Sequence, residues 1–319
     1  MRTSHFAALA SALAAPALAW NTDVHHQIGY ASEAFLKPET KEILAKILEP
    51  EAEGSLGRIS AWADEHRRTS EGSHSTTWHW INSADDAPQL CNTYFNRDCT
   101  EGGCVVSALA NETQILKGCI KDAKMGKLNN NGSDTTCAQA VKYITHFTQD
   151  IAQPMHVTGI ARGGNGVPVV FGGVDTNLHA IWDGRIVYSL ANVTSFPIDG
   201  IAPFFSSMID RIRADTYFTP VDEWTRCSSP GTPLACPIAW ARDSNEWNCD
   251  YAFSQATGAP DLLTSGYAEG AWPIVEIQMA KAVMRTATWF NRLVENCFHE
   301  REVIYEPNPS WAGGPNGGA

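Results

Sequence analysis

Histidine and aspartate residues recur along this chain at spacings that suit metal binding. His146 and Asp150 are four residues apart, and His179 and Asp183 repeat that spacing. Because residues four apart share one face of a helix, each pair can direct two ligands at one ion. Imidazole nitrogen and carboxylate oxygen without thiolate suit zinc in a catalytic setting. The other ligand-type residues of this series are Asp64, His79 and His156.

Each of these residues has a plain structural interpretation when it is viewed alone. A single buried histidine is more often a satisfied core residue than a ligand. Asp64 alone could be a helix cap or a salt-bridge partner. Two His-x3-Asp pairs in fixed order, with His156 between them, are poorly explained by separate accidents of packing. The whole series therefore favours a metal cluster.

The first residues of the chain have the pattern of a secretory signal peptide. Residues 1–19 contain Arg2, a short apolar stretch and the A-x-A sequence that ends at Ala19, and the apolar stretch is too short to span a bilayer. Cleavage there would give Trp20 a free α-amine, whose pKa of about 7.7 to 8.0 lets a metal ion displace its proton. The amine and carbonyl oxygen of Trp20 could then chelate a cation, with His25 five residues further on.

Composition agrees with secretion. Nine cysteines are ordinary in an oxidising compartment but many for a cytosolic protein of this size. A net charge of -12 argues against a protein that grips nucleic acid through a broad basic face, so phosphate recognition would need a local positive site that metal ions can supply. No later apolar run approaches a membrane span. The N-x-S/T acceptors for glycosylation are Asn111, Asn131 and Asn192.

The elements that must position the ligands are predicted to be mostly helical. Glycine and valine over 163–175 indicate a loop or short hairpin. We see no linker, so we expect one domain over 20–304 after a signal peptide over 1–19, followed by a disordered tail over 305–319. Apolar residues at helical spacing predict helices over 38–48, 138–148 and 274–294.

Taken in order, these motifs resemble the secreted zinc-dependent single-strand-specific nucleases and 3′-nucleotidases of fungi and plants. The resemblance implies a mainly α-helical fold with three zinc ions in one cleft, similar in fold to zinc-dependent phospholipase C. It also implies a secreted, extracellular, monomeric enzyme that hydrolyses single-stranded RNA and DNA to 5′-nucleotides and acts on 3′-nucleotides. The segments that carry it are Trp20-x4-His25, WAD ending at Asp64, HWIN from His79, HFTQD from His146, QPMH ending at His156 and NLHAIWD ending at Asp183.

The resemblance assigns the ligands to three zinc ions. The first ion takes Asp64, His79, His146 and Asp150. The second takes His156, His179 and Asp183. The third takes the Trp20 amine and carbonyl, His25 and a bridging Asp150.

Roles for other residues follow from chemistry and from the same resemblance. Asp64 is the candidate to orient and deprotonate the attacking water. Arg67, one helical turn later, could clamp a phosphate oxygen, although a solvated surface arginine is an equally good interpretation; the fungal enzymes carry a lysine there. Trp80 matches a stacking aromatic. The positions expected at the base edge are Asn82 and Asn165, the latter in the glycine turn that begins at Gly163.

Asn82 departs from the fungal pattern, in which an aspartate is usual. Aspartate only accepts hydrogen bonds, whereas asparagine both donates and accepts. We therefore expect the base preference to be shifted or relaxed, with catalysis at the zinc cluster retained.

The cysteines fit this scheme in part. The resemblance pairs Cys91 with Cys249 and Cys99 with Cys104. Local pairs with no support from the family are Cys119 with Cys137 and Cys227 with Cys236, which would leave Cys297 as the odd thiol.

Two rival functions use the same residues. Zinc-dependent phospholipases C resemble these nucleases, but they end the ligand series with glutamate and have a longer spacing from the first tryptophan to its histidine. Asp183 and the Trp20-x4-His25 spacing favour the nuclease. A non-catalytic zinc glycoprotein is the second rival, and structural zinc sites are usually closed and rich in cysteine.

Overall fold

A computed structural model of the chain describes residues 20–128, 135–193, 200–256 and 258–296. The expected signal peptide over 1–19 and tail over 305–319 lie outside the described residues, as do Asn131 and Cys297.

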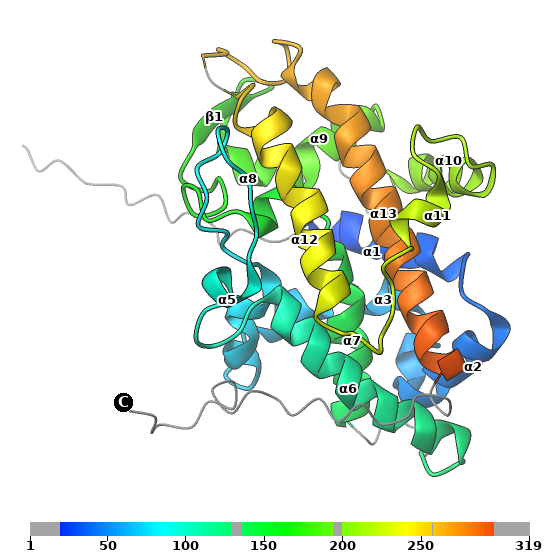
Figure 1. The fold of residues 1–319 in the computed structure, drawn as a ribbon. Coiled ribbons are helices and arrows are strands. Elements are labelled where there is room, and N and C mark those ends of the chain that lie inside the picture. The colour runs from blue at the N-terminus through cyan, green and yellow to red at the C-terminus, as the bar shows by residue number, and fades with distance from the viewer. Residues whose placement is uncertain (1–19, 129–134, 194–199, 257, 297–319) are drawn as a thin grey trace, which may run out of the picture.

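The fold is mainly α-helical, as predicted (Figure 1). The longest helices are α13 (Tyr267–Asn296), α6 (Val105–Lys124) and α7 (Thr135–Asp150). The other α-helices are α1 (Thr22–Glu33), α2 (Pro38–Ile47), α3 (Leu56–Ile59), α4 (Trp62–His66), α5 (Phe95–Asp98), α8 (Leu178–Ala180), α9 (Ile186–Leu190), α10 (Ala202–Arg213), α11 (Val221–Trp224) and α12 (Ala235–Trp247). The 3-10 segments are η1 (Pro50–Ala52), η2 (Gly72–His79) and η3 (Pro154–Val157), and the π-helical segments are η4 (Ile181–Arg185) and η5 (Asn248–Ala252).

The helices predicted from apolar spacing correspond to α2, α7 and α13, and the last two extend beyond the predicted ranges at both ends. The glycine-rich stretch forms a hairpin. Strand β1 (Pro168–Phe171) pairs antiparallel with β2 (Val174–Asn177), and the turn between them is Gly172-Gly173, with φ values of 62° and 75°. Such left-handed backbone suits glycine because it has no Cβ to clash.

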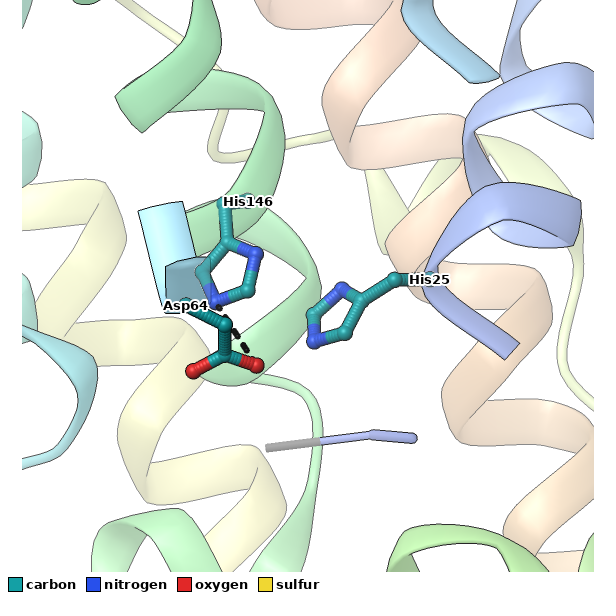
Figure 2. Close-up of side chains that lie close together, drawn as sticks. All are labelled: His25, Asp64 and His146. Carbon is teal, nitrogen blue, oxygen red and sulfur yellow. Dashed lines mark ion pairs between the residues drawn. The ribbon is translucent and has the colours of Figure 1, made fainter. Parts of the chain in front are cut away.

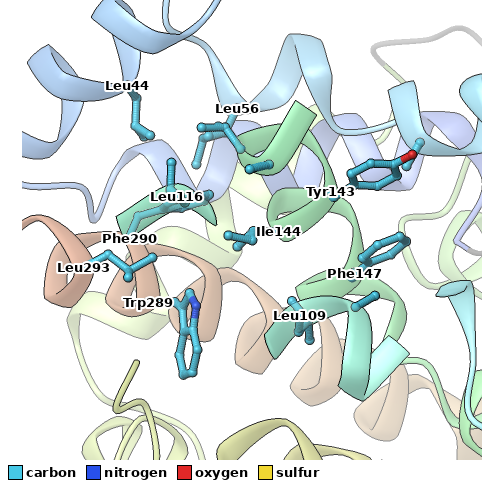
Figure 3. Close-up of a cluster of buried hydrophobic side chains, with 14 of the residues drawn as sticks. Leu44, Leu56, Leu109, Leu116, Tyr143, Ile144, Phe147, Trp289, Phe290 and Leu293 are labelled. Carbon is cyan, nitrogen blue, oxygen red and sulfur yellow. The ribbon is translucent and has the colours of Figure 1, made fainter. Parts of the chain in front are cut away.

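Two hydrophobic clusters build the interior. The first lies where α2, α6, α7 and the C-terminal half of α13 meet (Figure 3), with fully buried Leu44, Leu116, Ile144, Phe147 and Trp289. Fully burying one such side chain contributes roughly 1.5 to 3 kcal/mol. This packing fixes α7, the helix that carries one of the His-x3-Asp pairs.

The second cluster surrounds the N-terminal half of α13. It contains the indole of Trp20 and side chains of α1, α9 and α10. Helix α13 therefore runs through both clusters. Its buried Lys281 and Arg285 bind Asp243 of α12 at 2.6 and 2.8 Å, which holds α12 alongside α13.

Four disulfides brace the described chain: Cys91–Cys249, Cys99–Cys104, Cys119–Cys137 and Cys227–Cys236. These are the pairs expected from the sequence. The first joins segments 158 residues apart, and a disulfide that closes a long loop stabilises mainly by restricting the unfolded chain. Within the described ranges, no helix combines the length and apolar character needed to cross a membrane.

Candidate metal centre

Four of the expected ligands meet where α4, η2 and α7 converge. His79 ends η2, and its Nδ1 atom lies 3.0 Å from His146 Nε2 and 3.1 Å from Asp150 Oδ2. Asp64 of α4 faces the same point, with its Oδ1 3.6 Å from His79 Nδ1 and its Oδ2 3.9 Å from His146 Nε2. All four side chains are buried. Nitrogen and oxygen ligands for one ion thus converge in a place shielded from water.

A second group forms at the other His-x3-Asp pair. His179 on α8 and Asp183 on η4 lie one turn apart, with His179 Nε2 3.3 Å from Asp183 Oδ2. His156 of η3 joins them, its Nε2 4.0 Å from Asp183 Oδ1. The ligand atoms of these three buried residues lie within 4.8 Å of one another.

His25 of α1 reaches the first group from the other side. Its Nε2 lies 3.3 Å from Asp150 Oδ1, and its ring stacks on that of His146 with centroids 4.0 Å apart (Figure 2). The ligand atoms of His25, Asp64 and His146 lie within 4.8 Å of one another. His25 therefore lies close to Asp64 and His146 as well as to Asp150, which has one oxygen near His25 and the other near His79.

Trp20 is held firmly beside this group. Its indole is fully buried and donates from Nε1 to the carbonyl oxygen of Gln149 at 3.0 Å. The next residue, Asn21, donates its backbone N–H to the carbonyl oxygen of Asp183 at 2.8 Å. The Trp20 side chain is thus tied to the end of α7, and the main chain that follows it is tied to the second ligand group.

Backbone carbonyls orient three of the imidazole rings. A carbonyl can only accept, so each of these rings donates from Nδ1 and turns Nε2 toward the ligand groups. His79 is the exception, since its Nδ1 faces the cluster. The donors and acceptors are His146 to Ser60 (2.6 Å), His156 to His79 (2.7 Å) and His179 to Gly163 (2.5 Å).

Gln149, which the sequence analysis did not single out, organises the remaining ring. Its Oε1 lies 2.7 Å from His25 Nδ1, its Nε2 donates to Ser60 Oγ at 3.0 Å, and its carbonyl receives the Trp20 indole. The one available signal was its place in the HFTQD segment, directly before Asp150. A fully buried glutamine needs such partners, because leaving its amide unsatisfied would be costly.

The donor set fits a metal ion. Among the described residues, the buried His156 Nε2 has no hydrogen-bond partner, and the buried His25 Nε2 and Asp150 Oδ1 face each other at 3.3 Å without forming a hydrogen bond. Buried polar atoms are rarely left so. Neutral imidazole nitrogens and carboxylate oxygens are zinc ligands, and three to four of them in each group match the coordination of zinc. The residues present therefore fit the metal that the sequence implied.

Burial sets the protonation of these rings. It lowers the pKa of His25 and His156, and it lowers that of His79 to about 4, so all three are neutral near pH 7, the form that binds metal. At His146 burial acts in the same direction, but the carboxylates of Asp150 and Asp64 outweigh it and raise the pKa.

Burial shifts the pKa of Asp183 in the direction that disfavours its charged, metal-binding form. Burial raises its pKa well above the ordinary value, and only the amide of Gln153, donating to Oδ1 at 2.6 Å, opposes this strongly. A carboxylate in such a place becomes favourable once a cation is bound beside it. Gln153, like Gln149, was missed from the sequence.

Arg67 lies beside Asp64. Its Nη2 is 2.9 Å from Asp64 Oδ1, and the two side chains are only 8% and 6% exposed. The interpretation of Arg67 as a solvated surface residue is therefore wrong. Its guanidinium also lies 5.9 Å from the centre of the half-buried Trp80 ring. Arg67 is therefore next to Asp64, the candidate general base, and to Trp80, the candidate for stacking on a nucleobase.

The expected base-edge residues lie on neighbouring loops. Ser83 accepts the N–H of Gly159 at 3.1 Å, and a Cβ on Gly159 would stand 3.6 Å from Asn82. Asn82 is exposed beside the loop that leads to Gly163. The side-chain amide of Asn165 donates within its own turn, to the carbonyl oxygen of Arg162 at 2.9 Å.

Comparisons with known proteins agree with this site. The model of the S1/P1 nuclease family matches residues 20–295. Nuclease S1 of Aspergillus oryzae is 30% identical over 283 residues, which cover 88% of this chain and 93% of that protein. Nuclease P1 of Penicillium citrinum is 28% identical over 276 residues, covering 86% and 97%. Endonuclease 2 of Arabidopsis thaliana is 29% identical over 283 residues, covering 86% and 90%.

Proposed function

The chain belongs to the S1/P1 nuclease family and is a hydrolase of phosphoric ester bonds, and from this premise we propose that it cleaves single-stranded RNA and DNA to 5′-nucleotides and removes phosphate from 3′-nucleotides. The observation that carries the proposal is the convergence of three buried His/Asp groups, whose residues come from well-separated positions between His25 and Asp183. The nuclease domain is proposed to span 20–304.

Three zinc ions are proposed as cofactors. The first ion would be held by Asp64, His79, His146 and Asp150. The second would be held by His156, His179 and Asp183. The third would be held by the Trp20 amine and carbonyl, His25 and Asp150. When bound, such ions neutralise charge on phosphoryl oxygens and bring the pKa of a bound water toward 7.

Asp64 is proposed to act as the base. Its carboxylate is buried beside the cluster; burial alone would raise its pKa, but His146, His79 and Arg67 outweigh burial and lower it. It therefore stays ionised and can accept a proton from the attacking water. The water oxygen bonds to phosphorus, and the bond from phosphorus to the 3′-oxygen breaks. The departing 3′-oxygen takes up a proton from solvent and Asp64 releases its proton to solvent, so that a 5′-phosphate and a 3′-hydroxyl result.

Arg67 is proposed to hold the scissile phosphate. Its guanidinium lies beside Asp64 at the metal centre, and the planar fork of N–H donors on a guanidinium matches phosphoryl oxygens. Trp80, next to Arg67 and directly after the ligand His79, would stack on an unpaired base. Asn82, Gly163 and Asn165 would line the base edge. A base within a duplex cannot enter such a site, which gives the preference for single strands.

Secretion is part of the proposal. Four disulfides suit an oxidising compartment, and cleavage of a signal peptide over 1–19 would free the Trp20 amine. Asn111 and Asn192 are exposed, as glycosylation requires.

The test is hydrolysis by the chain that begins at Trp20. Single-stranded RNA and DNA, duplex DNA, a 3′-nucleotide and phosphatidylcholine are compared, each with and without a chelator. We expect chelator-sensitive cleavage of the single strands and the 3′-nucleotide, restored by zinc, and loss of about a thousandfold or more in Asp64→Asn. Cleavage of the lipid alone would overturn the substrate assignment, and equal rates on duplex would overturn the strand preference.

A further inference from the structure

An exposed tyrosine lies beside two arginines outside the metal centre. Tyr94 is 49% exposed, with the guanidinium of Arg97 4.8 Å and that of Arg242 5.8 Å from its ring centre. Both arginines are themselves exposed. We propose that these three residues form a second binding site for single-stranded nucleic acid, which holds the strand beyond the nucleotide being cleaved. The proposal rests on the proposed function.

The chemistry of the three residues suits a strand. Bases stack on aromatic rings and on guanidinium planes whatever their identity, and arginine also binds phosphate. Arg97 is paired with Asp98 through two contacts, Nε to Oδ1 at 2.6 Å and Nη2 to Oδ2 at 2.9 Å, whereas no carboxylate among the described residues lies within ion-pair distance of Arg242. On a chain with a net charge of -12, the exposed Arg242 beside an exposed ring is a local positive group of the kind that phosphate requires.

The three residues are held rigidly. Arg242 of α12 donates from Nε to the carbonyl oxygen of Thr93 at 2.8 Å, and the backbone N–H of Tyr94 donates to Asp98 at 2.7 Å. The disulfides Cys91–Cys249 and Cys99–Cys104 flank the segment. A site that is already ordered loses little conformational entropy when it binds.

The second site is connected to the expected base-binding residue Asn82. Ser83, its neighbour, bonds Thr93 through their hydroxyls at 2.7 Å, and Thr93 precedes Tyr94. With Cα atoms 3.8 Å apart along the chain, this path limits the distance from Asn82 to Tyr94 to about 15 Å between backbones. At about 3.4 Å per phosphate in a stacked strand, that is the span of four or five nucleotides. One strand can therefore reach both sites.

The experiment compares long and short substrates. The double variant Tyr94→Leu/Arg242→Gln is assayed on a single strand of about 20 nucleotides, long enough to cover both sites, and on a dinucleotide that can fill only the metal centre. We expect kcat/KM on the long strand to fall about tenfold through KM, with the dinucleotide unchanged. The slope of log KM against log salt should fall by about 0.7, because one phosphate is no longer neutralised by an arginine.

A matched control removes the same groups elsewhere. Phe218→Leu/Arg226→Gln takes an exposed aromatic ring and an exposed arginine from beside α11, which Figure 1 shows on the opposite side of the molecule from α5. It should leave both substrates unaffected. The single variant Arg242→Gln, at the surface, serves if the double variant does not fold.

Equal loss on long and short substrates, or no loss on either, would overturn the proposal, since the first result would make the three residues a structural brace. Should the chain cleave no nucleic acid at all, the proposed function would fail separately. Fluorescence anisotropy would then measure how tightly a labelled oligonucleotide binds to protein treated with a chelator, which tests the second site without cleavage. Weaker binding by the double variant would support it, and unchanged binding would overturn it.

Discussion

His179 donates its Nδ1 hydrogen to the carbonyl oxygen of Gly163 over 2.5 Å. Gly163 belongs to a run of four residues with positive φ, which includes Ala161 at 46° and Arg162 at 59°. Such backbone is costly for residues other than glycine. A Cβ on Gly163 would also stand 2.6 Å from the carbonyl oxygen of Met155. The strained turn therefore has a clear purpose: it aims one imidazole at its metal group.

Gly163→Ala should accordingly damage the second metal group. Its φ of 62° costs an alanine roughly 1 to 2 kcal/mol, and the clash with Met155 must move the carbonyl that orients His179. Removing such an orienting hydrogen bond typically costs about tenfold to a hundredfold in metal affinity or activity. Zinc content and kcat are the measurements.

Gly173→Ala is the matched control. Its φ of 75° is equally left-handed, but no atom lies within 4 Å of its Cβ position. It should lose similar stability and keep full zinc and activity. If both variants kept their zinc, the turn would not be what positions His179.

The Trp20 amine gives a second prediction. A chain extended by one residue converts this amine to an amide, whose nitrogen has no available lone pair for a metal. The extended form should bind two zinc ions where the form beginning at Trp20 binds three, and kcat should fall by at least about tenfold. The indole and the bond from Asn21 to Asp183 hold this backbone beside the ligands in the structure.

Metal analysis of both forms checks this. The control is the extended protein cut back to Trp20 by an added protease site, which should regain zinc and activity together. Equal zinc content in the two forms would remove the amine from the ligand set.

Short sequence patterns predict much of this fold. The apolar spacing around Ile43 and Leu44 predicts α2, and that around Val283 and Phe290 predicts α13, because both helices bury one face against a core. The order of His146, Asp150, His179 and Asp183 predicts ligand pairs because residues four apart share one face of an α-helix. His179 and Asp183 lie 3.3 Å apart even though the segment at Asp183 is π-helical. These features depend on short stretches of chain.

The features that depend on distant residues were not predictable in the same way. The burial of Arg67 follows from how α4 packs against α7 and Trp80, and no local pattern encodes it. The stacking of His25 on His146 joins α1 to a helix 121 residues further along, as their numbers show. The role of Gln149 depends on its contacts with Trp20, Ser60 and His25, which are distant in sequence. The sequence around it shows only a polar residue in a helix.

Asn82 should determine base preference. Asn82→Asp replaces a side chain that donates and accepts by one that only accepts, so bases that present N–H donors should be favoured relative to the others. A difference of one hydrogen bond corresponds to about threefold to tenfold in relative kcat/KM. Rates on the four ribonucleoside 3′-monophosphates measure this. Asn96→Asp, at an exposed position of α5, is the control, and an unchanged ranking in Asn82→Asp would contradict the assignment.

The buried carboxyl of Glu112, which is not one of the expected metal ligands, should make the stability of the protein depend on pH. It is 4% exposed on α6, and burial raises its pKa from 4.5 to about 7, although the amide of Asn111 donates to its Oε1 at 3.0 Å. The folded protein thus holds this proton more tightly than the unfolded chain. Between pH 4.5 and 7 the folded state has more protons bound, so stability falls as pH rises.

Glu112→Gln should therefore stabilise the protein at high pH and not at low pH. At 1.36 kcal/mol per pKa unit, the ionised form costs up to about 3 kcal/mol above pH 7, or several degrees in Tm for a chain of this size. Comparing Tm with the wild type at the same pH cancels effects of metal loss. The difference should be near zero at about pH 4.5 and positive at about pH 8, whereas the exposed control Glu42→Gln should show none. A constant difference across this range would mean that Glu112 is not the buried titrating group.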